Sequence, residues 1–424
     1  MGLFSGDLSK LLAANVWVNF VFLMTFVVLG LILSNVEFGA FRVAQAYIAV
    51  ATTIAMLGLN TAVTHLFPRM SPAERKAALP VIQLLVVVSS LIAGVILYGI
   101  VPTTGAQVGF FQQALYFSSF PLIVAGAAIC NIALAVMQAN GELAAYSKFQ
   151  IFWKSSLFVA ALAGAFFLDA LSVLIAMALI YPVFLLLSSA RIRRQDFVLD
   201  WSVLHRLGPQ FFKSAIWPFA AACASIVYAN LEFLSIGEVD LSSGLAGDYS
   251  LASLIFIGGA ALFLPFQTFA GSRVVNRRIT LSGLFGLQAI CLATIMLVAI
   301  CAYGVAQVLH YLDPVKFSGN FLDFAFLVCL KLSVWGSYAV IGSVLYYLDK
   351  GFQSFILSLF ALSATLLAFF ILDVATLRDV VIVQILSSVL VMLGSAWLAY
   401  AGFRKRDLQP QTQPGSSDAG QSEL

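Results

Sequence analysis

Charged residues are scarce in this sequence of 424 residues: 10% are Asp, Glu, Lys or Arg, whereas soluble domains carry about 25%. Hydrophobic residues make up 62%, and the mean hydropathy of the whole chain is +1.01. This composition excludes disordered, fibrous and nucleic-acid-binding proteins, and it excludes a sizeable soluble catalytic domain. The formal net charge of +3 is too small to imply a polyanionic partner, so we expect no nucleic acid.

Residues suited to metal, disulfide or nucleotide chemistry are also few. The five cysteines all lie inside apolar segments and form no Cys-x-x-Cys pair, so we expect neither a disulfide framework nor a zinc site. The three histidines lie at the ends of such segments or in a central linker. No G-x-x-x-x-G-K-[ST] loop is present. We therefore expect no metal, no cofactor and no enzymatic activity.

What the sequence has in abundance is apolar runs long enough to cross a bilayer as helices, which takes about 20 residues. The predicted fold is therefore an all-α polytopic membrane protein with about twelve transmembrane helices. The first run is not followed by a small-residue cleavage site, and we interpret it as a retained anchor. The runs cover residues 11–35, 38–66, 80–102, 111–138, 146–168, 170–190, 211–236, 247–271, 281–309, 321–348, 352–373 and 379–402.

Lysine and arginine predict the orientation, because cytoplasmic loops of membrane proteins are enriched in them. With both termini in the cytoplasm, the inner segments hold 17 of the 22 cations, and the outer loops hold Lys316 and Arg378. The remaining three, Arg42, Lys154 and Lys331, lie more than two residues inside the ends of the runs. No outer loop exceeds about a dozen residues, which is too short for a folded catalytic domain. The function is expected inside the bundle, as in a transporter or channel.

A polar linker divides the twelve runs into two sets of six. Transporters are often built from two such repeats with the substrate site between them. The C-terminal tail is rich in Pro, Gly and Ser and is predicted to be disordered in the cytoplasm. The predicted parts are an N-terminal lobe at 1–190, a cytoplasmic linker at 191–210, a C-terminal lobe at 211–403 and the tail at 404–424.

A short pattern repeats at the start of the second run of each half: the segments beginning at Gly39 and Gly247 both read G-x-aromatic-x-aliphatic-Ala. Together with EFGAFRVAQAY, LGLNTAVTHLFPRM and NLEFLSIGEVDLSSGLAGDYSLASL, this pattern resembles the Wzx-type polysaccharide flippases. These belong to the multidrug/oligosaccharidyl-lipid/polysaccharide exporter superfamily. The resemblance implies two six-helix lobes, related by a pseudo-two-fold axis around a central cavity. Where the family often has an Asp in the seventh span, this chain has Glu232.

The resemblance also implies a substrate, partners and a location. The substrate would be an undecaprenyl-diphosphate-linked oligosaccharide, moved from the cytoplasmic to the periplasmic leaflet of a bacterial inner membrane. The product would feed O-antigen, capsule or exopolysaccharide synthesis. Expected partners are this anionic lipid-linked oligosaccharide, membrane lipids, a polysaccharide polymerase and other glycan-assembly proteins.

An ionised side chain within a span costs roughly 2.5–3.5 kcal/mol on insertion scales, so each should face a cavity or a partner. Arg42 lies on a polar stripe with Gln45, which suits the wall of a wet lumen, although an Arg near a span end also snorkels. Lys331 lies near mid-membrane on the face of Trp335 and Tyr338. This set suits an anionic glycolipid head group, and the alternative is a structural Lys paired to a carboxylate.

Four further residues carry open alternatives. Glu232 is either the carboxylate for a coupling proton or ion, or a solvated acid near the outer interface. Lys154 either faces the lumen or snorkels toward the cytoplasm. Asn15 and Asn19 share a helix face and either line the inner mouth or bond neighbouring helices.

Among the charged residues that lie more than two positions inside either end of a run, there are three cations and one carboxylate, and this balance favours an anionic substrate such as a diphosphate. The sequence therefore favours a flippase that works by alternating access. Two alternatives remain: an ion-coupled multidrug or small-molecule antiporter with the same fold, and a non-transporting membrane scaffold in a glycan-assembly complex.

Overall fold

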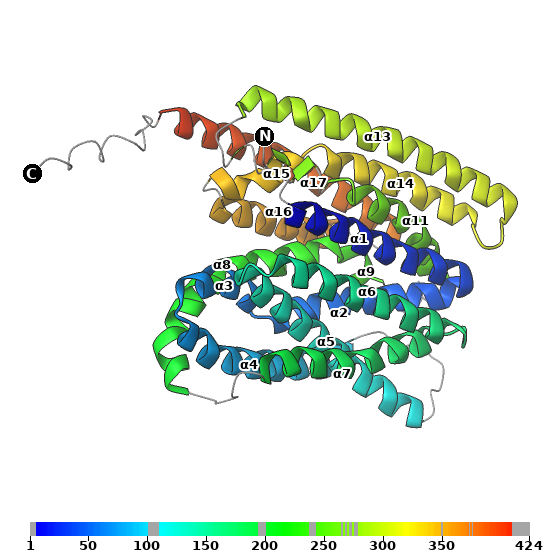
Figure 1. Cartoon of the computed structure of the whole chain (residues 1–424). Helices are drawn as coiled ribbons and strands as arrows, with labels where there is room; N and C mark the ends of the chain where they lie inside the picture. The colour runs from blue at the N-terminus through cyan, green and yellow to red at the C-terminus, as the bar shows by residue number, and fades with distance from the viewer. Residues whose placement is uncertain are drawn as a thin grey trace, which may run out of the picture.

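The computed structural model describes most of the chain and shows only helices, turns and loops there (Figure 1), in agreement with the all-α prediction. Nine of the described helices are long and apolar enough to cross a membrane, and two shorter apolar helices accompany them. Eleven of the twelve predicted runs coincide with one helix or with consecutive helices, and the run 247–271 begins with α11, which ends at Ala260. The described residues are 6–100, 110–193, 201–236, 243–263, 266–267, 269–270, 274, 279–348, 351–372, 374 and 376–408.

The first half of the chain forms a bundle in which α1 packs on α6, α4 packs on α5, and α7 packs on both α5 and α6. A short 3-10 turn at Phe67–Arg69 joins the third and fourth helices. The helices are α1 (Gly6–Ile32), α2 (Asn35–Ala55), α3 (Leu59–Leu66), α4 (Pro72–Ile100), α5 (Phe110–Ala139), α6 (Leu143–Ala165) and α7 (Ala170–Arg193).

The second half packs α11 and α13 on α14, and α16 on α17. Figure 1 shows these helices stacked beside the first bundle, with α1 and α8 between the two sets. A 3-10 turn, η2, covers Leu345–Leu348. The helices are α8 (Trp201–Ala229), α9 (Leu231–Leu234), α11 (Leu245–Ala260), α13 (Leu281–Leu312), α14 (Gly319–Gly336), α15 (Ala339–Val344), α16 (Gly351–Ile371) and α17 (Leu377–Leu408).

The predicted linker is largely helical where the structure describes it. Residues 191–193 end α7, 201–210 begin α8, and 194–200 lie outside the described residues. The helix α8 packs on α2, α3 and α4 as well as on α16, so it contacts both halves. In the tail, 404–408 end α17 and the remainder lies outside the described residues. The exact lobe boundaries stay a prediction.

Four of the predicted runs are broken within their length. In the run 247–271, α11 ends at Ala260 and a turn follows at Ala261 and Leu262. The run 38–66 breaks at Leu57 and Gly58, which have positive φ values of 51° and 69°. The run 211–236 breaks at Asn230, and the run 321–348 breaks at Ser337 and Tyr338. Irregular backbone at membrane depth needs partners, because lipid offers no hydrogen bonds.

Gln288 of α13 supplies partners for the break between α14 and α15. Its amide nitrogen donates to Gly336 O, and its carbonyl oxygen accepts from the backbone N–H groups of Val340 and Ile341 at 3.0 and 3.1 Å. Gln288 is buried. One side chain thus satisfies both sides of the interruption.

The two halves meet where α2 and α11 begin, in contacts that we call the α2–α11 seal (Asn35, Gly39, Gly247, Asp248, Ser318). A Cβ atom on Gly39 would lie 2.8 Å from the backbone nitrogen of Gly247, and one on Gly247 would overlap the Asn35 carbonyl group. The absence of side chains therefore lets the two backbones touch. The repeated glycines of the sequence pattern thus form the contact between the halves.

Hydrogen bonds complete the seal. Asn35 donates to Asp248 Oδ1 at 2.7 Å, and Ser318 donates to Asp248 Oδ2 at 2.6 Å. Lys316, in the loop before α14, donates to the Leu33 carbonyl oxygen, and partial burial lowers the pKa of its ammonium group. The predicted orientation places the seal at the outer end of the bundle.

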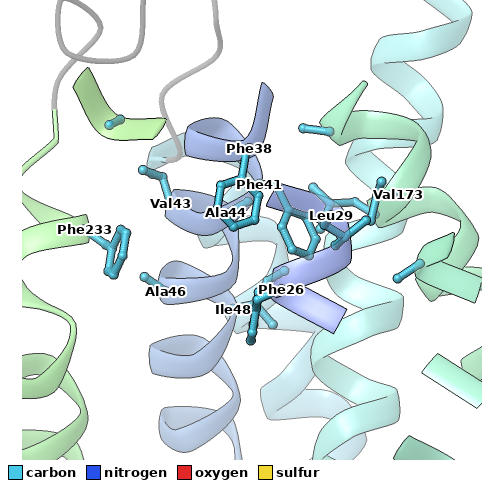
Figure 2. Close-up of a cluster of buried hydrophobic side chains, with 14 of the residues drawn as sticks. Phe26, Leu29, Phe38, Phe41, Val43, Ala44, Ala46, Ile48, Val173 and Phe233 are labelled. Atoms are coloured by element: carbon cyan, nitrogen blue, oxygen red, sulfur yellow. The ribbon is translucent and has the colours of Figure 1, made fainter. Parts of the chain in front are cut away.

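A hydrophobic cluster beside the seal contains residues of both halves. Figure 2 shows Phe26 of α1, Phe38 and Phe41 of α2, and Phe233 of α9 in this cluster. Burial of an aromatic side chain stabilises by roughly 1.5–3 kcal/mol, so the halves are held together by packing as well as by the seal.

We expect Gly247→Leu to separate the halves at the seal, because no side chain fits between the two backbones. The measurement is the distance between spin labels on engineered cysteines at Val36 and Ser243, in a background in which the native cysteines are replaced. The distance should increase by several ångströms. Gly304→Leu is the matched control, since a Cβ atom there meets nothing within 4 Å. An unchanged distance in the Gly247 variant would contradict the tight contact.

Candidate functional site

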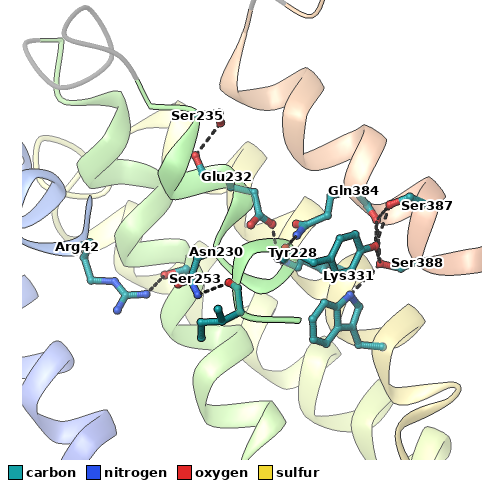
Figure 3. A network of polar contacts seen from close by, with 12 residues as sticks. Arg42, Tyr228, Asn230, Glu232, Ser235, Ser253, Lys331, Gln384, Ser387 and Ser388 are labelled. Carbon is teal, nitrogen blue, oxygen red and sulfur yellow. Dashed lines mark hydrogen bonds and ion pairs between the residues drawn. The ribbon is translucent and has the colours of Figure 1, made fainter. Parts of the chain in front are cut away.

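A buried ion pair lies in the second half of the bundle (Figure 3). Lys331 of α14 donates to Glu232 Oε1 of α9, and the two residues are 4% and 0% exposed. The break at Asn230 ends α8 and starts the short helix that carries Glu232. The other carboxylate oxygen, Oε2, has no hydrogen-bond partner. In this structure Lys331 is paired with a carboxylate, as in the alternative interpretation of Lys331 as a structural lysine.

An aromatic and hydroxyl network surrounds this pair. The rings of Tyr228 and Trp335 stack at 6.1 Å with an interplanar angle of 6°. The Tyr228 hydroxyl lies 2.8 Å from both Ser387 Oγ and Ser388 Oγ, and Trp335 Nε1 donates to Ser388 at 2.9 Å. Tyr338 is half-buried, with its ring 6.3 Å from that of Trp335. The expected sugar-binding aromatics are thus packed together around the ion pair.

Sequence reasoning missed the partners of this network on α17. Gln384 donates to the Tyr228 carbonyl oxygen and is completely buried. Gln384, Ser387 and Ser388 lie at positions i, i+3 and i+4, so they share one helix face. A helical projection of the run 379–402 would have revealed this polar face.

Arg42 lies between the two halves and is 9% exposed. Its guanidinium carbon is 4.3 Å from the centre of the Phe26 ring and 4.7 Å from that of the Phe233 ring. Nη2 makes one long hydrogen bond of 3.5 Å to Ser253, and Nε has no partner. No carboxylate among the described residues forms an ion pair with it. Arg42 is therefore a buried, uncompensated cation held by aromatic rings.

A cavity of about 280 Å³ lies near the middle of the helices of the first half. Lys154 of α6 is its only charged residue among those that the structure describes, and Gln45 of α2 lines it too. The Lys154 ammonium lies 4.0 Å from the centre of the Trp153 ring. The cavity lining is Val21, Phe22, Thr25, Phe26, Phe41, Gln45, Ile48, Ala49, Thr52, Thr53, Met56, Ile123, Ala127, Asn131, Trp153, Lys154, Leu157, Met177, Tyr181 and Ile226.

The candidate residues thus fall into three places rather than one. Lys154 and Gln45 line the cavity, Arg42 lies between the halves, and the set of Glu232 and Lys331 with its aromatics lies in the second half. Asn15 and Asn19 are half-buried on α1 and do not line the cavity. The binding, coupling and inner-mouth roles of all these residues stay predictions. No cluster of metal-ligating side chains occurs within the described part of the chain.

The sequence matches no protein-family model and no curated protein sequence. Solved structures do match. The lipid II flippase MurJ, in an inward closed conformation, has a TM-score of 0.68 and 12% identity, over 93% of this chain and 89% of that chain. The fold is that of the MurJ and MATE transporters.

Two MATE structures support this statement. A variant of the Vibrio cholerae MATE transporter VcmN has a TM-score of 0.64 and 13% identity, over 95% of this chain and 96% of that chain. An outward-facing multidrug resistance MATE transporter of the MOP superfamily has a TM-score of 0.56 and 12% identity, over 93% and 97%. These neighbours share a twelve-helix, two-lobe transporter fold, so the predicted fold class is confirmed, and the chain is a multi-pass membrane protein.

We expect the stability of the protein to depend on Glu232 and Lys331 being present together as an ion pair. Lys331→Met leaves Glu232 buried without a counter-ion, and breaking such a pair costs about 3–5 kcal/mol. The double variant Lys331→Met/Glu232→Gln removes both charges and should regain most of that loss. The measurement is the thermal unfolding midpoint of the purified protein in detergent. A double variant as unstable as the sum of the two single variants would contradict a direct interaction.

Removal of the Arg42 charge, in contrast to removal of the Lys331 charge, should stabilise the protein. Because its buried charge has no counter-ion among the described residues, Arg42→Met should raise the thermal midpoint, by about 1 °C if the net gain is near 1 kcal/mol. The cation–π contacts offset only part of the desolvation cost. Arg404→Met, at an exposed position at the end of α17, is the control and should leave the midpoint unchanged. A lower midpoint for Arg42→Met would show that the aromatic contacts outweigh desolvation.

Proposed function

We propose that the chain flips an anionic, undecaprenyl-diphosphate-linked oligosaccharide from the cytoplasmic to the periplasmic leaflet, as a Wzx-type exporter. The observation that supports this is the sign of the uncompensated charge inside the bundle. Lys154 and Arg42 have no carboxylate partner among the described residues, whereas Glu232 bonds Lys331 and Asp248 bonds Asn35 and Ser318. An interior with spare cations suits an anionic cargo.

The shared fold with MurJ, a lipid II flippase, is compatible with a lipid-linked substrate. In this proposal the polar head group enters the bundle while the polyprenyl tail stays in the membrane lipid. Lys154 and Gln45 contact the head group in the cavity. Arg42 joins them once the halves move apart, because its present contacts include Phe233 and Ser253 of the second half.

Transport follows alternating access between the two lobes. The α2–α11 seal closes one end of the bundle, which the predicted orientation makes the outer end. Opening it breaks the Asn35–Asp248 contact and exposes Arg42. Protonation of Glu232 releases Lys331, whose ammonium and neighbouring Trp335 and Tyr338 then offer a second contact for the head group. The membrane potential supplies about 2.3 kcal/mol per charge per 100 mV.

The proposal places the chain in a bacterial inner membrane with both termini in the cytoplasm. The flipped repeat unit would pass to a polysaccharide polymerase and other glycan-assembly proteins. The product would be O-antigen, capsule or exopolysaccharide.

A second candidate is an ion-coupled antiporter of small molecules. The observation that favours it is the fold shared with the MATE multidrug transporters. The spare cations of the interior argue against cationic drugs as its substrates, because such compounds need carboxylates.

The test is surface polysaccharide in a strain that lacks the gene and carries single variants. Arg42→Ala and Lys154→Ala should each reduce export at least about tenfold, as expected for the loss of a buried charge contact. Lys148→Ala is the matched control, because Lys148 is an exposed lysine on the same helix as Lys154. Protein level in the membrane is measured alongside. Normal export in both variants at normal protein level would overturn the proposal, and a lost resistance to toxic compounds without a change in polysaccharide would favour the antiporter.

A further inference from the structure

The size of the Lys154 cavity suits a small ligand group. Its volume of about 280 Å³ lies just below the usual range for small-molecule pockets, about 300–1,000 Å³. One sugar ring with its substituents fits such a space.

Several polar groups in the cavity wall lack a partner in the protein. Thr52 is 8% exposed, and its buried hydroxyl has no hydrogen bond; the Lys154 ammonium forms no hydrogen bond or ion pair with a described residue. The Gln45 amide nitrogen reaches only the sulfur of Met177, at 3.9 Å. Because buried polar groups are normally paired, these three donors indicate a ligand that accepts hydrogen bonds.

Acceptors line the same cavity. Asn131 uses its amide nitrogen on Ala127 O, which leaves its carbonyl oxygen free to accept. Thr25 and Thr53 donate their hydroxyl hydrogens to backbone carbonyls of their own helices, so their oxygens can also accept. A wall with both donors and acceptors suits hydroxyl groups, which do both. A bare diphosphate only accepts hydrogen bonds and would leave the acceptors unused.

The charge count points to a single negative charge. Lys154 is the only charged residue of the described lining, and a diphosphate brings about two negative charges. Arg42 does not line the cavity itself: its guanidinium carbon lies 4.3 Å from the centre of the Phe26 ring, and that ring belongs to the cavity wall. One ammonium group matches one carboxylate.

We propose that this cavity binds one acidic sugar, a hexuronate-type ring whose carboxylate pairs with Lys154 and whose hydroxyls bond Gln45, Thr52 and Asn131. The inference rests on the proposed function and narrows it: the transported repeat unit carries an acidic sugar. The lipid diphosphate lies outside the cavity.

The binding test uses the purified full-length protein in lipid nanodiscs with four probes: glucuronate, glucose, acetate and inorganic pyrophosphate. Calorimetric titration should show glucuronate binding about tenfold or more tightly than glucose, because only glucuronate pairs with Lys154. Acetate, which lacks the ring, and pyrophosphate should bind more weakly than glucuronate. Undetectable glucuronate binding, or pyrophosphate or glucose binding equally well, would overturn the assignment.

Single variants distinguish recognition of the sugar's carboxylate from recognition of its hydroxyl groups. Lys154→Gln should abolish the preference for glucuronate over glucose, Lys154→Arg should keep it, and Lys148→Gln should leave binding unchanged. Thr52→Val should weaken both sugars together, since it removes a hydroxyl contact and no charge. A preference that survives Lys154→Gln would place the carboxylate elsewhere and overturn the proposal.

The same experiments distinguish this inference from the proposed function. A free acidic sugar and one within a lipid-linked repeat offer the same carboxylate, so export of a repeat unit with its uronate reduced to the neutral sugar forms the second arm. Poor export of the neutral repeat, rescued by Lys154→Gln, supports the acidic-sugar site. If export depends on the protein but is equal for both repeats and glucuronate does not bind, the flippase stands and the acidic-sugar site falls. If glucuronate binds but deletion of the gene leaves the polysaccharide unchanged, the proposed function falls.

Discussion

An ionised side chain in a membrane-embedded bundle needs a counter-ion, a ring face or a ligand, and this requirement organises the interior of the protein. Each of the four charges that lie deep in the predicted runs meets it differently. Glu232 and Lys331 are each other's counter-ion, and the Arg42 guanidinium lies against two aromatic rings. Lys154 has the face of Trp153 and an open cavity. The Lys154 ammonium keeps its hydrogen-bonding capacity free, which is why we propose the cavity as the ligand site.

The contact between the halves depends on a second constraint, the close approach of two backbones. Gly39 and Gly247 occupy equivalent positions in the two halves, and each lets the other helix approach. The polar contacts of Asn35, Asp248 and Ser318 lie beside the glycines, so packing and hydrogen bonding coincide at one end of the bundle. A contact built from few side chains can separate without unfolding either half, as alternating access requires.

The fold was largely predictable because apolar runs of bilayer length mark the helices directly. The site was less so. Glu232 and Lys331 are 99 residues apart in the chain, and no periodicity within a single helix reveals a partner on another. The helix breaks at Leu57, Asn230 and Ser337 lie inside runs that are continuously apolar in the sequence, so composition does not reveal them. Tertiary contacts, such as those of Gln288 at the last break, stabilise the interrupted backbone. Arg42 and Lys154 were identified as charges within spans, but whether each faces a cavity or a ring depends on neighbouring helices.

The position of α8 has a consequence for the order in which the protein assembles. In sequence it opens the second half, yet it packs on α2, α3 and α4 and supplies Ile226 to the cavity wall. Among the described residues, all those that line the cavity therefore lie in the first 226 positions of the chain. Because N-terminal parts fold first during synthesis, the cavity can close while the ribosome is still translating α11 and the helices after it. The proposed ligand-binding cavity can therefore form before most of the second half has been synthesised.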